Sequence, residues 1–261
     1  MEKKDDLQVY QSNPLLKARK HYGILEHRLL RLALADLKPH LKNSTYYDKE
    51  IRPFHMETAE VVEVFGGTTN KRIYEQLREA CKQMFDSKIE LGDDKNFKLV
   101  HLFSEISFDS RKGLDIYFSQ RVKNLLLEME RGNYTRTLLS LSFSLSSKYS
   151  LILLELMLQY QGRQKNGVIE RDLSIEELRF SLDVPENAYA GRMNNFRRFV
   201  IDSAIAEINE KTDYHMEPEY GLARGRFNKI TGFHFTLHLP KVKEKNSIHN
   251  PNLRESHFRE I

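Results

Sequence analysis

Five side chains suited to nucleic-acid contact stand close together in the second half of the chain. They are Arg192, Asn194, Asn195, Arg197 and Arg198. Arginine and asparagine can each form paired hydrogen bonds, with guanine and adenine edges respectively, in the major groove of DNA. No acidic residue stands between Asn187 and Ile201 to offset the arginines. The cluster indicates DNA binding, and the alternative is an ordinary solvated helix face.

A single helix is predicted to carry this cluster. Apolar residues recur behind it at helical spacing: Met193, Phe196, Val200, Ile201, Ala204, Ile205 and Ile208. We therefore predict a helix that begins at Ala188, with an apolar side packed on a core and a polar front. The free N–H groups and the positive dipole end at the start of such a helix favour phosphate contact. These features are typical of a recognition helix that enters a major groove.

A second basic cluster follows in a predicted turn between two strands. The strands are YHMEPEY and FNKITGFHFTLHLP, and the segment from Tyr220 to Lys243 contains no acidic residue. The turn and the start of the next strand hold Arg224, Arg226, Asn228 and Lys229. In a winged helix this turn is the wing, which lies on the phosphate backbone beside the groove. Two basic elements in this order favour DNA binding over the solvated-face alternative.

The first half of the chain has a weaker version of the same arrangement. A predicted helix over TTNKRIYEQLREACKQMF is led by Thr69, Asn70, Lys71 and Arg72, with Arg78 further along. Glu75 and Glu79 dilute this positive charge. We expect this helix to contact DNA, and a mainly structural helix is nearly as consistent with its composition.

The predicted elements repeat in order along the chain. The first half has helices over 22–37, 56–65 and 68–85, then strands over 87–91, 97–108 and 114–119. After an irregular bridge over 129–140, the second half has a helix over 146–160, a strand over 168–174 and a helix over 174–182 that opens with a Ser174–Glu177 capping box. We therefore predict an α+β fold of two tandem winged-helix domains (helix-turn-helix plus β-wing) with pseudo-duplicated topology. The predicted domains are 1–130, for DNA backbone contact and dimerisation, and 131–240, for sequence-specific binding, followed by a polar tail over 241–261.

Composition limits the classes of protein that fit. The chain has 261 residues, 40% hydrophobic content and a formal charge of +4, which suit a globular protein rather than a disordered chain. Its single cysteine, Cys81, excludes an internal disulfide. No apolar run reaches the roughly 18 residues that span a bilayer, and MEKKDDLQVYQSN lacks the apolar core of a secretory signal. We expect a cytoplasmic protein without a membrane partner.

Motifs for catalysis and cofactor binding are weak. The chain has no G-x-x-x-x-G-K-[ST] loop, no G-x-S-x-G and no H-E-x-x-H, so we predict neither an enzyme nor a cofactor or metal site. His234 and His238 share one face of a predicted strand because their spacing is even. HFTLH nevertheless has the wrong spacing for the metal motif of a rolling-circle nicking enzyme. That class, with one of the 12 tyrosines as nucleophile, is the remotest alternative.

The chain resembles the replication initiators of iteron-bearing plasmids over most of its length. In the first half the resemblance lies in SNPLLKARKHYGILEHRLLRLALADLKP. In the second half it is carried by LSSKYSLILLELMLQY, LSIEELRFSLDV, YAGRMNNFRRFVIDSAIAEINEKTDYHMEPE and GFHFTL. These segments are similar to that family's second winged-helix domain in residue type and order. Their succession, rather than any single short motif, is specific.

This resemblance implies a function that composition and spacing do not supply. Members of the family bind directly repeated origin sequences in double-stranded DNA as monomers and help to open the adjacent duplex. They also recruit the host initiator and the replicative helicase, and as dimers many repress their own promoter. For this chain the resemblance implies that both predicted recognition helices and the second wing contact DNA through the residues named above. It also makes the strands between Phe97 and Phe118 the candidate dimer interface, and a dedicated winged-helix repressor is the alternative function.

Overall fold

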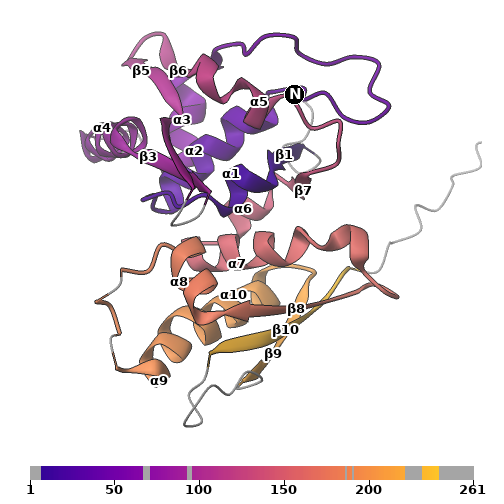
Figure 1. Ribbon diagram of the computed structural model, residues 1–261. Coiled ribbons are helices and arrows are strands. Elements are labelled where there is room, and N and C mark those ends of the chain that lie inside the picture. Colours follow the sequence, from indigo (N-terminus) through magenta and orange to yellow (C-terminus); the bar gives the residue numbers. More distant parts are fainter. Residues whose placement is uncertain are drawn as a thin grey trace, which may run out of the picture.

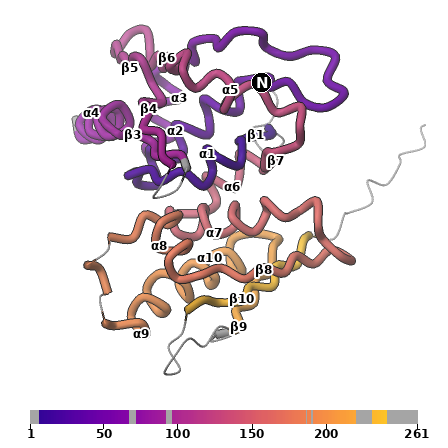
Figure 2. The backbone as a smooth tube through the Cα atoms, viewed as in Figure 1, coloured from indigo at the N-terminus to yellow at the C-terminus, as the bar shows by residue number. Residues whose placement is uncertain are grey.

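Two hydrophobic cores organise the molecule, which is seen here in a computed structural model. The structure describes residues 7–66, 71–92, 96–185, 187–189, 191–220 and 231–240. One core is built from residues between Val9 and Leu139, and the other mainly from residues between Leu141 and Leu237. Figures 1 and 2 show the two resulting domains stacked one above the other, with the indigo-to-magenta half of the chain in the upper domain.

The helices and strands follow one another with short connections. The upper domain and the connection below it contain β1 (Gln8–Ser12), α1 (Asn13–Lys17), α2 (Ile24–Ala35), β2 (Phe54–Met56), α3 (Thr58–Val64), α4 (Lys71–Asp86), β3 (Lys88–Gly92), β4 (Phe97–His101), β5 (Phe103–Asp109), β6 (Gly113–Phe118), η2 (Gln120–Val122), α5 (Lys123–Leu126), β7 (Tyr134–Leu138) and α6 (Leu141–Ser144). The lower domain contains α7 (Lys148–Leu158), η3 (Gln161–Arg163), β8 (Val168–Ser174), α8 (Ile175–Ser181), α9 (Met193–Phe196), the π-helical segment η4 (Arg197–Asp202), α10 (Ser203–Lys211), β9 (His215–Tyr220) and β10 (Gly232–His238).

Each domain contains a three-stranded sheet, and the two sheets have the same topology. The strand order is β2-β6-β5 in the upper domain and β8-β10-β9 in the lower one, and every pair is antiparallel. In each of these sheets the strand that precedes the helix-turn-helix therefore comes first in the chain and pairs with the sheet's last strand, β6 or β10, and the sheet's last two strands form the wing hairpin. The predicted fold, two tandem winged helices with a repeated topology, is confirmed. The upper domain adds two antiparallel pairs, β1-β7 and β3-β4.

Two helices show how the sequence pattern determines burial. In α4 the buried positions Ile73, Leu77, Ala80 and Met84 recur at intervals of three and four residues, so that one side faces the core and the other stays polar. In α7 every residue from Ser150 to Leu158 is buried. A helix that is apolar all round must be covered on all sides, and α7 lies between the two domains (Figure 1).

The predicted irregular bridge over 129–140 contains a strand. There β7 pairs with β1, with Gln8 opposite Leu138 and Ser12 opposite Tyr134. The partner strands lie at opposite ends of the upper domain's sequence, and both are rich in polar residues. The prediction was wrong because short polar strands are recognised mainly by their partners, and here the partner is distant in sequence.

The strand predicted over 97–108 is two strands. The chain changes sheets at Leu102, which is buried between them, so that β4 pairs with β3 while β5 pairs with β6. The polar tail predicted over 241–261 lies outside the described residues. Among the described helices, none is both long enough and apolar enough to span a bilayer.

The junction between the domains is continuous and partly polar. Two neighbouring residues of α1, Leu15 and Leu16, belong to the upper and the lower core respectively. Beside them the guanidinium of Arg31 on α2, which is 2% exposed, forms an ion pair with Glu155 on α7. The same guanidinium donates hydrogen bonds to the hydroxyl groups of Ser142 and Thr137. A single buried side chain therefore joins α2, α6, α7 and β7.

Glu207 of α10 holds the start of α7. Its carboxylate accepts hydrogen bonds from the backbone N–H groups of Ser146 and Ser147, at 2.8 and 3.1 Å, and from the Ser150 hydroxyl at 2.5 Å. Burial by itself would raise the pKa of Glu207, but these bonds and the ammonium of Lys211 lower it to about 2. The carboxylate stays ionised and fixes the recognition helix against the helix at the domain junction.

Candidate nucleic-acid interface

The lower helix-turn-helix begins at a well-formed helix cap. The Ser174 hydroxyl accepts a hydrogen bond from the backbone N–H of Glu177 at 3.0 Å, which confirms the predicted N-cap of α8. The Glu177 carboxylate pairs with the nearly buried Arg171 of β8, at 2.5 Å, instead of turning back to the cap. The predicted capping box is therefore only half formed, and its acidic side chain fastens α8 to the sheet.

The turn before the recognition helix is longer than the sequence indicated. Asp183, Tyr189 and Gly191 have positive φ angles of 51°, 57° and 67°, and left-handed residues interrupt a helix. The helix consequently begins at Met193, with Arg192 as its N-cap. The predicted start at Ala188 was wrong because an aromatic residue with positive φ is uncommon and cannot be recognised from composition.

Five predicted contact residues occupy the first turns of this helix, at the lower left of Figure 1. Arg192, Asn194 and Arg198 are exposed, and Asn195 and Arg197 are half-buried. Asn194 and Arg198 stand four residues apart, so they share one exposed face. The opposite face is buried through the predicted apolar residues Phe196, Val200, Ile201, Ala204, Ile205 and Ile208. The structure therefore brings the predicted cluster together on a helix fixed to the core.

A π-helical segment, not predicted from the sequence, sorts the two neighbouring arginines. Between Arg197 and Asp202 the helix widens, and Arg197 Nε lies 3.4 Å from Asp202 Oδ2. Residues five apart become neighbours in a π-helix, and such segments often occur at functional sites. The guanidinium of Arg198 instead lies over the ring of Phe199, 5.3 Å from its centroid, and Phe199 is 51% exposed. Arg197 is held against its own helix, whereas Arg198 points outward.

The recognition helix of the upper domain, α4, carries mixed charge as predicted. Arg72 and Arg78 are exposed on it, and so are Glu75 and Glu79. Glu79 pairs with Lys82 at 3.0 Å. Of the other predicted contacts on this helix, Thr69 and Asn70 lie outside the described residues, and Lys71 is the first residue of α4.

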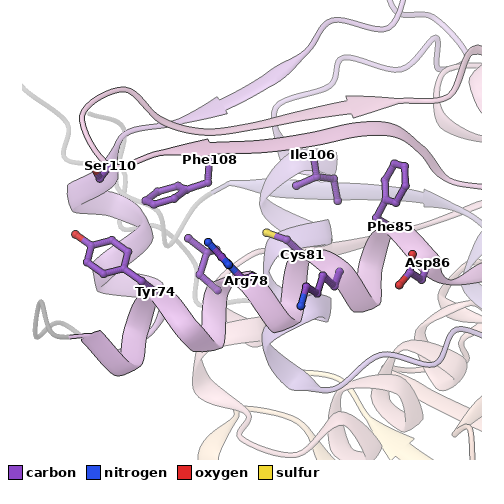
Figure 3. A pocket seen from close by; sticks show the side chains of 10 residues that line it. Tyr74, Arg78, Cys81, Phe85, Asp86, Ile106, Phe108 and Ser110 are labelled. Carbon is purple, nitrogen blue, oxygen red and sulfur yellow. The ribbon is translucent and has the colours of Figure 1, made fainter.

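A groove separates α4 from strand β5 of the upper wing. Figure 3 shows Tyr74, Arg78 and Cys81 of α4 facing Ile106 and Phe108 of β5 across it. The rings of Tyr74 and Phe108 lie 5.8 Å apart at their centroids. Burial, together with the charge of Glu26, raises the pKa of the Cys81 thiol to about 11, so this cysteine stays protonated and inert.

Two basic residues at the tip of the upper wing were missed in the sequence. Arg111 and Lys112 are exposed in the turn between β5 and β6, and Asp109 Oδ1 accepts hydrogen bonds from both backbone N–H groups, at 2.8 and 3.1 Å. Gly113 closes the turn with a φ of 108°, and any Cβ there would lie 2.2 Å from the Met56 carbonyl oxygen. The signal was the same as for the second wing: basic residues followed by glycine between two strands.

The structure describes the wing of the lower domain only in part. Arg224, Arg226, Asn228 and Lys229 lie outside the described residues, between β9 and β10. On β10, His234 pairs with Asp172 at 2.8 Å, and His238 lies 4.0 Å from Glu217. Within the parts of the chain that the structure describes, no group of three or more His, Cys, Asp or Glu side chains is placed to hold a metal ion.

Comparison with known proteins assigns both halves of the chain to one kind of protein. The family model "Initiator Replication protein, WH1" matches residues 8–158, and "Initiator Rep protein, WH2" matches residues 174–237. A "Replication initiation protein" from Escherichia coli is 22% identical over 208 residues, which are 78% of this chain but only 62% of that protein. The match thus spans less than two thirds of this relative's length.

A solved structure has the same fold. It is described as "Crystal structure of Pi initiator protein in complex with iteron DNA", and it superposes with a TM-score of 0.69 at 21% sequence identity. The match covers 91% of this chain and 99% of that one. At this level of identity the likeness shows that the arrangement of two winged helices is shared.

Proposed function

The chain belongs to the initiator replication protein family, and from this premise we propose that it binds double-stranded DNA sequence-specifically to initiate plasmid replication. The target sites would be directly repeated origin sequences, or iterons. The solved relative was crystallised with iteron DNA. The role we propose is one of binding and assembly rather than catalysis.

One observation carries the proposal: the exposed front of the lower recognition helix combines Arg192, Asn194 and Arg198 with no acidic side chain between them. Asn194 and Arg198 share the outward face and can reach base edges, where a bidentate contact discriminates by about 1–3 kcal/mol. Arg192, at the N-cap, lies where free backbone N–H groups already favour a phosphate. The lower domain is therefore the proposed sequence reader.

The upper domain is the proposed second contact. In Figure 1, α4 and α9 both lie on the left side of the molecule, so one face can meet one side of a duplex. Two recognition helices in successive major grooves, roughly 10 bp apart, would cover about 20 bp. The mixed charge of α4 and the basic tip at Arg111 and Lys112 support a larger share of phosphate contacts here.

The open edge of strand β4 in the upper domain is suited to self-association. Strand β4 exposes Phe97 and Leu99, which are 61% and 52% accessible and project from the same face of the strand. Among the described strands β4 pairs only with β3, which leaves its other edge open to strand addition. We propose this edge, within the predicted segment Phe97–Phe118, as the dimer interface of an autorepressing form. Opening of the origin and recruitment of the host initiator and replicative helicase complete the proposed role.

The test is selection of bound duplexes from a random pool at about 150 mM salt, followed by footprinting, because specificity is meaningful only at a stated salt concentration. A non-palindromic site of about two helical turns is expected for a monomer that reads with both domains. A short palindrome would instead indicate a dimeric repressor with one domain on each half-site. No enriched sequence would refute sequence-specific binding.

Initiation is tested separately in the cell. Deleting the gene should abolish maintenance of a plasmid that carries the selected repeats, whereas a dedicated repressor would be dispensable for copying. Incubating supercoiled DNA with the protein and Mg²⁺ or Mn²⁺ addresses the nicking alternative. Intact supercoils are expected, and nicked circles would overturn the non-catalytic assignment.

A further inference from the structure

A short segment between α1 and α2 contacts the helix-turn-helix units of both domains. It consists of residues 19–22 and is called the strap below. Its interior residue Lys20 is buried, and the Nζ amino group donates hydrogen bonds to the carbonyl oxygens of Leu15 and Ala18, at 2.6 and 2.8 Å. These bonds tie the strap to the end of α1, so its backbone has a defined path between the domains.

On the upper side the strap is fastened to the end of α4. The side-chain amide of Gln83 donates a hydrogen bond to the carbonyl oxygen of His21. The hydroxyl of Tyr22 donates to the carbonyl oxygen of Met84 at 3.3 Å. Arg19 adds an antiparallel backbone bridge to strand β3, which follows α4 directly. The strap therefore moves with the upper recognition helix.

On the lower side the strap is fastened to Asp183. The Asp183 carboxylate, 11% exposed, lies 2.8 Å from His21 Nδ1, 3.3 Å from Arg19 Nε and 3.1 Å from the Lys148 ammonium of α7. The Arg19 guanidinium also lies over the ring of Phe180 on α8, at 5.8 Å. Asp183 is the first left-handed residue after α8, so it belongs to the turn that leads to the lower recognition helix.

We propose that the strap sets the distance and rotation between the two DNA-reading helices, with Asp183 as the positioning residue that selects the spacing of the two half-sites. This inference rests on the proposed two-domain binding of DNA. Each inserted base pair moves one half-site by about 3.4 Å along the duplex and turns it by about one tenth of a helical turn. With a rigid strap, the affinity therefore falls steeply when base pairs are inserted between the half-sites. With a loosened strap, the affinity depends only weakly on that spacing.

Asp183→Asn in the full-length protein is the direct test. Asparagine is nearly isosteric and tolerates positive φ, so the turn keeps its path while the carboxylate charge is lost. Affinity is measured on the selected site, on the same site with one or two base pairs inserted between the halves, and on each half alone. A loosened connection lowers the effective concentration of the second domain. We expect the variant to bind the original site about tenfold more weakly and to lose most of the penalty for insertion.

Two further variants distinguish a role in positioning the domains from a general loss of structure. Arg19→Gln removes a strap contact from the other side, so it should flatten the same spacing profile, and the double variant should be no worse than the stronger single one. Asp172→Asn is the matched control, because Asp172 pairs with His234 inside the lower sheet and does not bridge the domains.

Half-site affinity distinguishes failure of this inference from failure of the proposed function. Equal spacing profiles for wild type and Asp183→Asn would overturn the role of the strap, while leaving sequence-specific binding in place. A loss of binding to the isolated lower half-site would show that Asp183 only supports its own domain, which also overturns the inference. A wild-type protein with no bipartite site would refute two-domain binding itself.

Discussion

Replacing Asp202 with asparagine tests whether Arg197 is withheld from DNA by its own helix. Asp202 Oδ2 lies 3.4 Å from Arg197 Nε, and the two side chains are 35% and 43% exposed. An ion pair this accessible contributes about 0–1 kcal/mol to folding. For a chain of this size, Asp202→Asn should therefore lower the melting temperature by no more than about 4 °C. The variant remains folded, and its DNA binding can be interpreted.

The magnitude follows from counterion release. Each cation that neutralises a phosphate adds about 0.9 to the slope of log affinity against log salt. If Asp202→Asn releases Arg197 to one phosphate, the slope becomes steeper by about 0.9. Between about 50 and 200 mM salt this difference amounts to an additional affinity change of about 3.5-fold. The gain is independent of sequence, so both affinities should rise together and the ratio of specific to non-specific affinity should stay unchanged.

The assay is fluorescence anisotropy with two labelled duplexes, one containing the selected site and one scrambled, over this salt range. Glu210→Gln is the matched control, because Glu210 is exposed near the end of the same continuous helix and its loss changes the net charge equally. A slope for Asp202→Asn equal to that of wild type would show that Asp202 does not withhold Arg197 from DNA. An equally steep slope for Glu210→Gln would show the same, since net charge alone would then explain the effect.

Arg198, Glu207 and Lys20 each provide a separate test. Arg198→Ala should lose about 1–3 kcal/mol of binding and relax the preference at one base pair; a repeated selection with unchanged preference would exclude base reading by Arg198. Glu207, with a pKa of about 2 in place of 4.5, stabilises the fold fully above 4.5 and loses that contribution as the pH falls toward 2. Glu207→Gln should accordingly lower the unfolding free energy by about 1–3 kcal/mol at neutral pH, and urea titrations of the two proteins should converge in acid. Burial lowers the pKa of Lys20 from 10.5 to about 7, so between pH 7 and pH 10.5 the unfolded chain binds more protons than the folded chain. Relative to Lys20→Met, wild-type stability should rise with pH above 7 by at most about 1.4 kcal/mol per pH unit, and parallel pH profiles would contradict a neutral buried amine.

Local periodicity was enough to predict most of the helices. The apolar spacing of α4 and the uninterrupted apolar run of α7 depend on the segment itself, so both helices lie where the sequence indicated. The pairing of β1 with β7 joins strands far apart in sequence, and the sequence of neither strand indicates which strand it pairs with. The left-handed turn through Tyr189 was missed for another reason, since aromatic residues rarely adopt that conformation.

The candidate site was predicted where charge is unopposed and missed where it is balanced. The front of the lower recognition helix stood out because no acid interrupts Arg192 to Arg198. Arg111 and Lys112 were missed because the acidic residue Asp109 precedes them in the sequence. The structure shows that the Asp109 carboxylate accepts hydrogen bonds from backbone N–H groups of the turn and does not pair with the two basic side chains. The π-helical segment that separates the surroundings of Arg197 and Arg198 is a backbone feature that residue types and their spacing do not indicate.

The two domains have the same fold but differ in surface charge, and the junction fixes these two different surfaces relative to each other. A buried ion pair such as Arg31–Glu155 contributes little net stability, because desolvation offsets the attraction, yet it tolerates little displacement. The strap adds a second connection at Asp183, close to the lower recognition helix. In the binding mode we propose, the domains are held in one register, the lower helix reads bases and the upper domain of mixed charge contributes mainly phosphate contacts. Specificity in that binding mode would depend on the distance between the domains as much as on the side chains that face DNA.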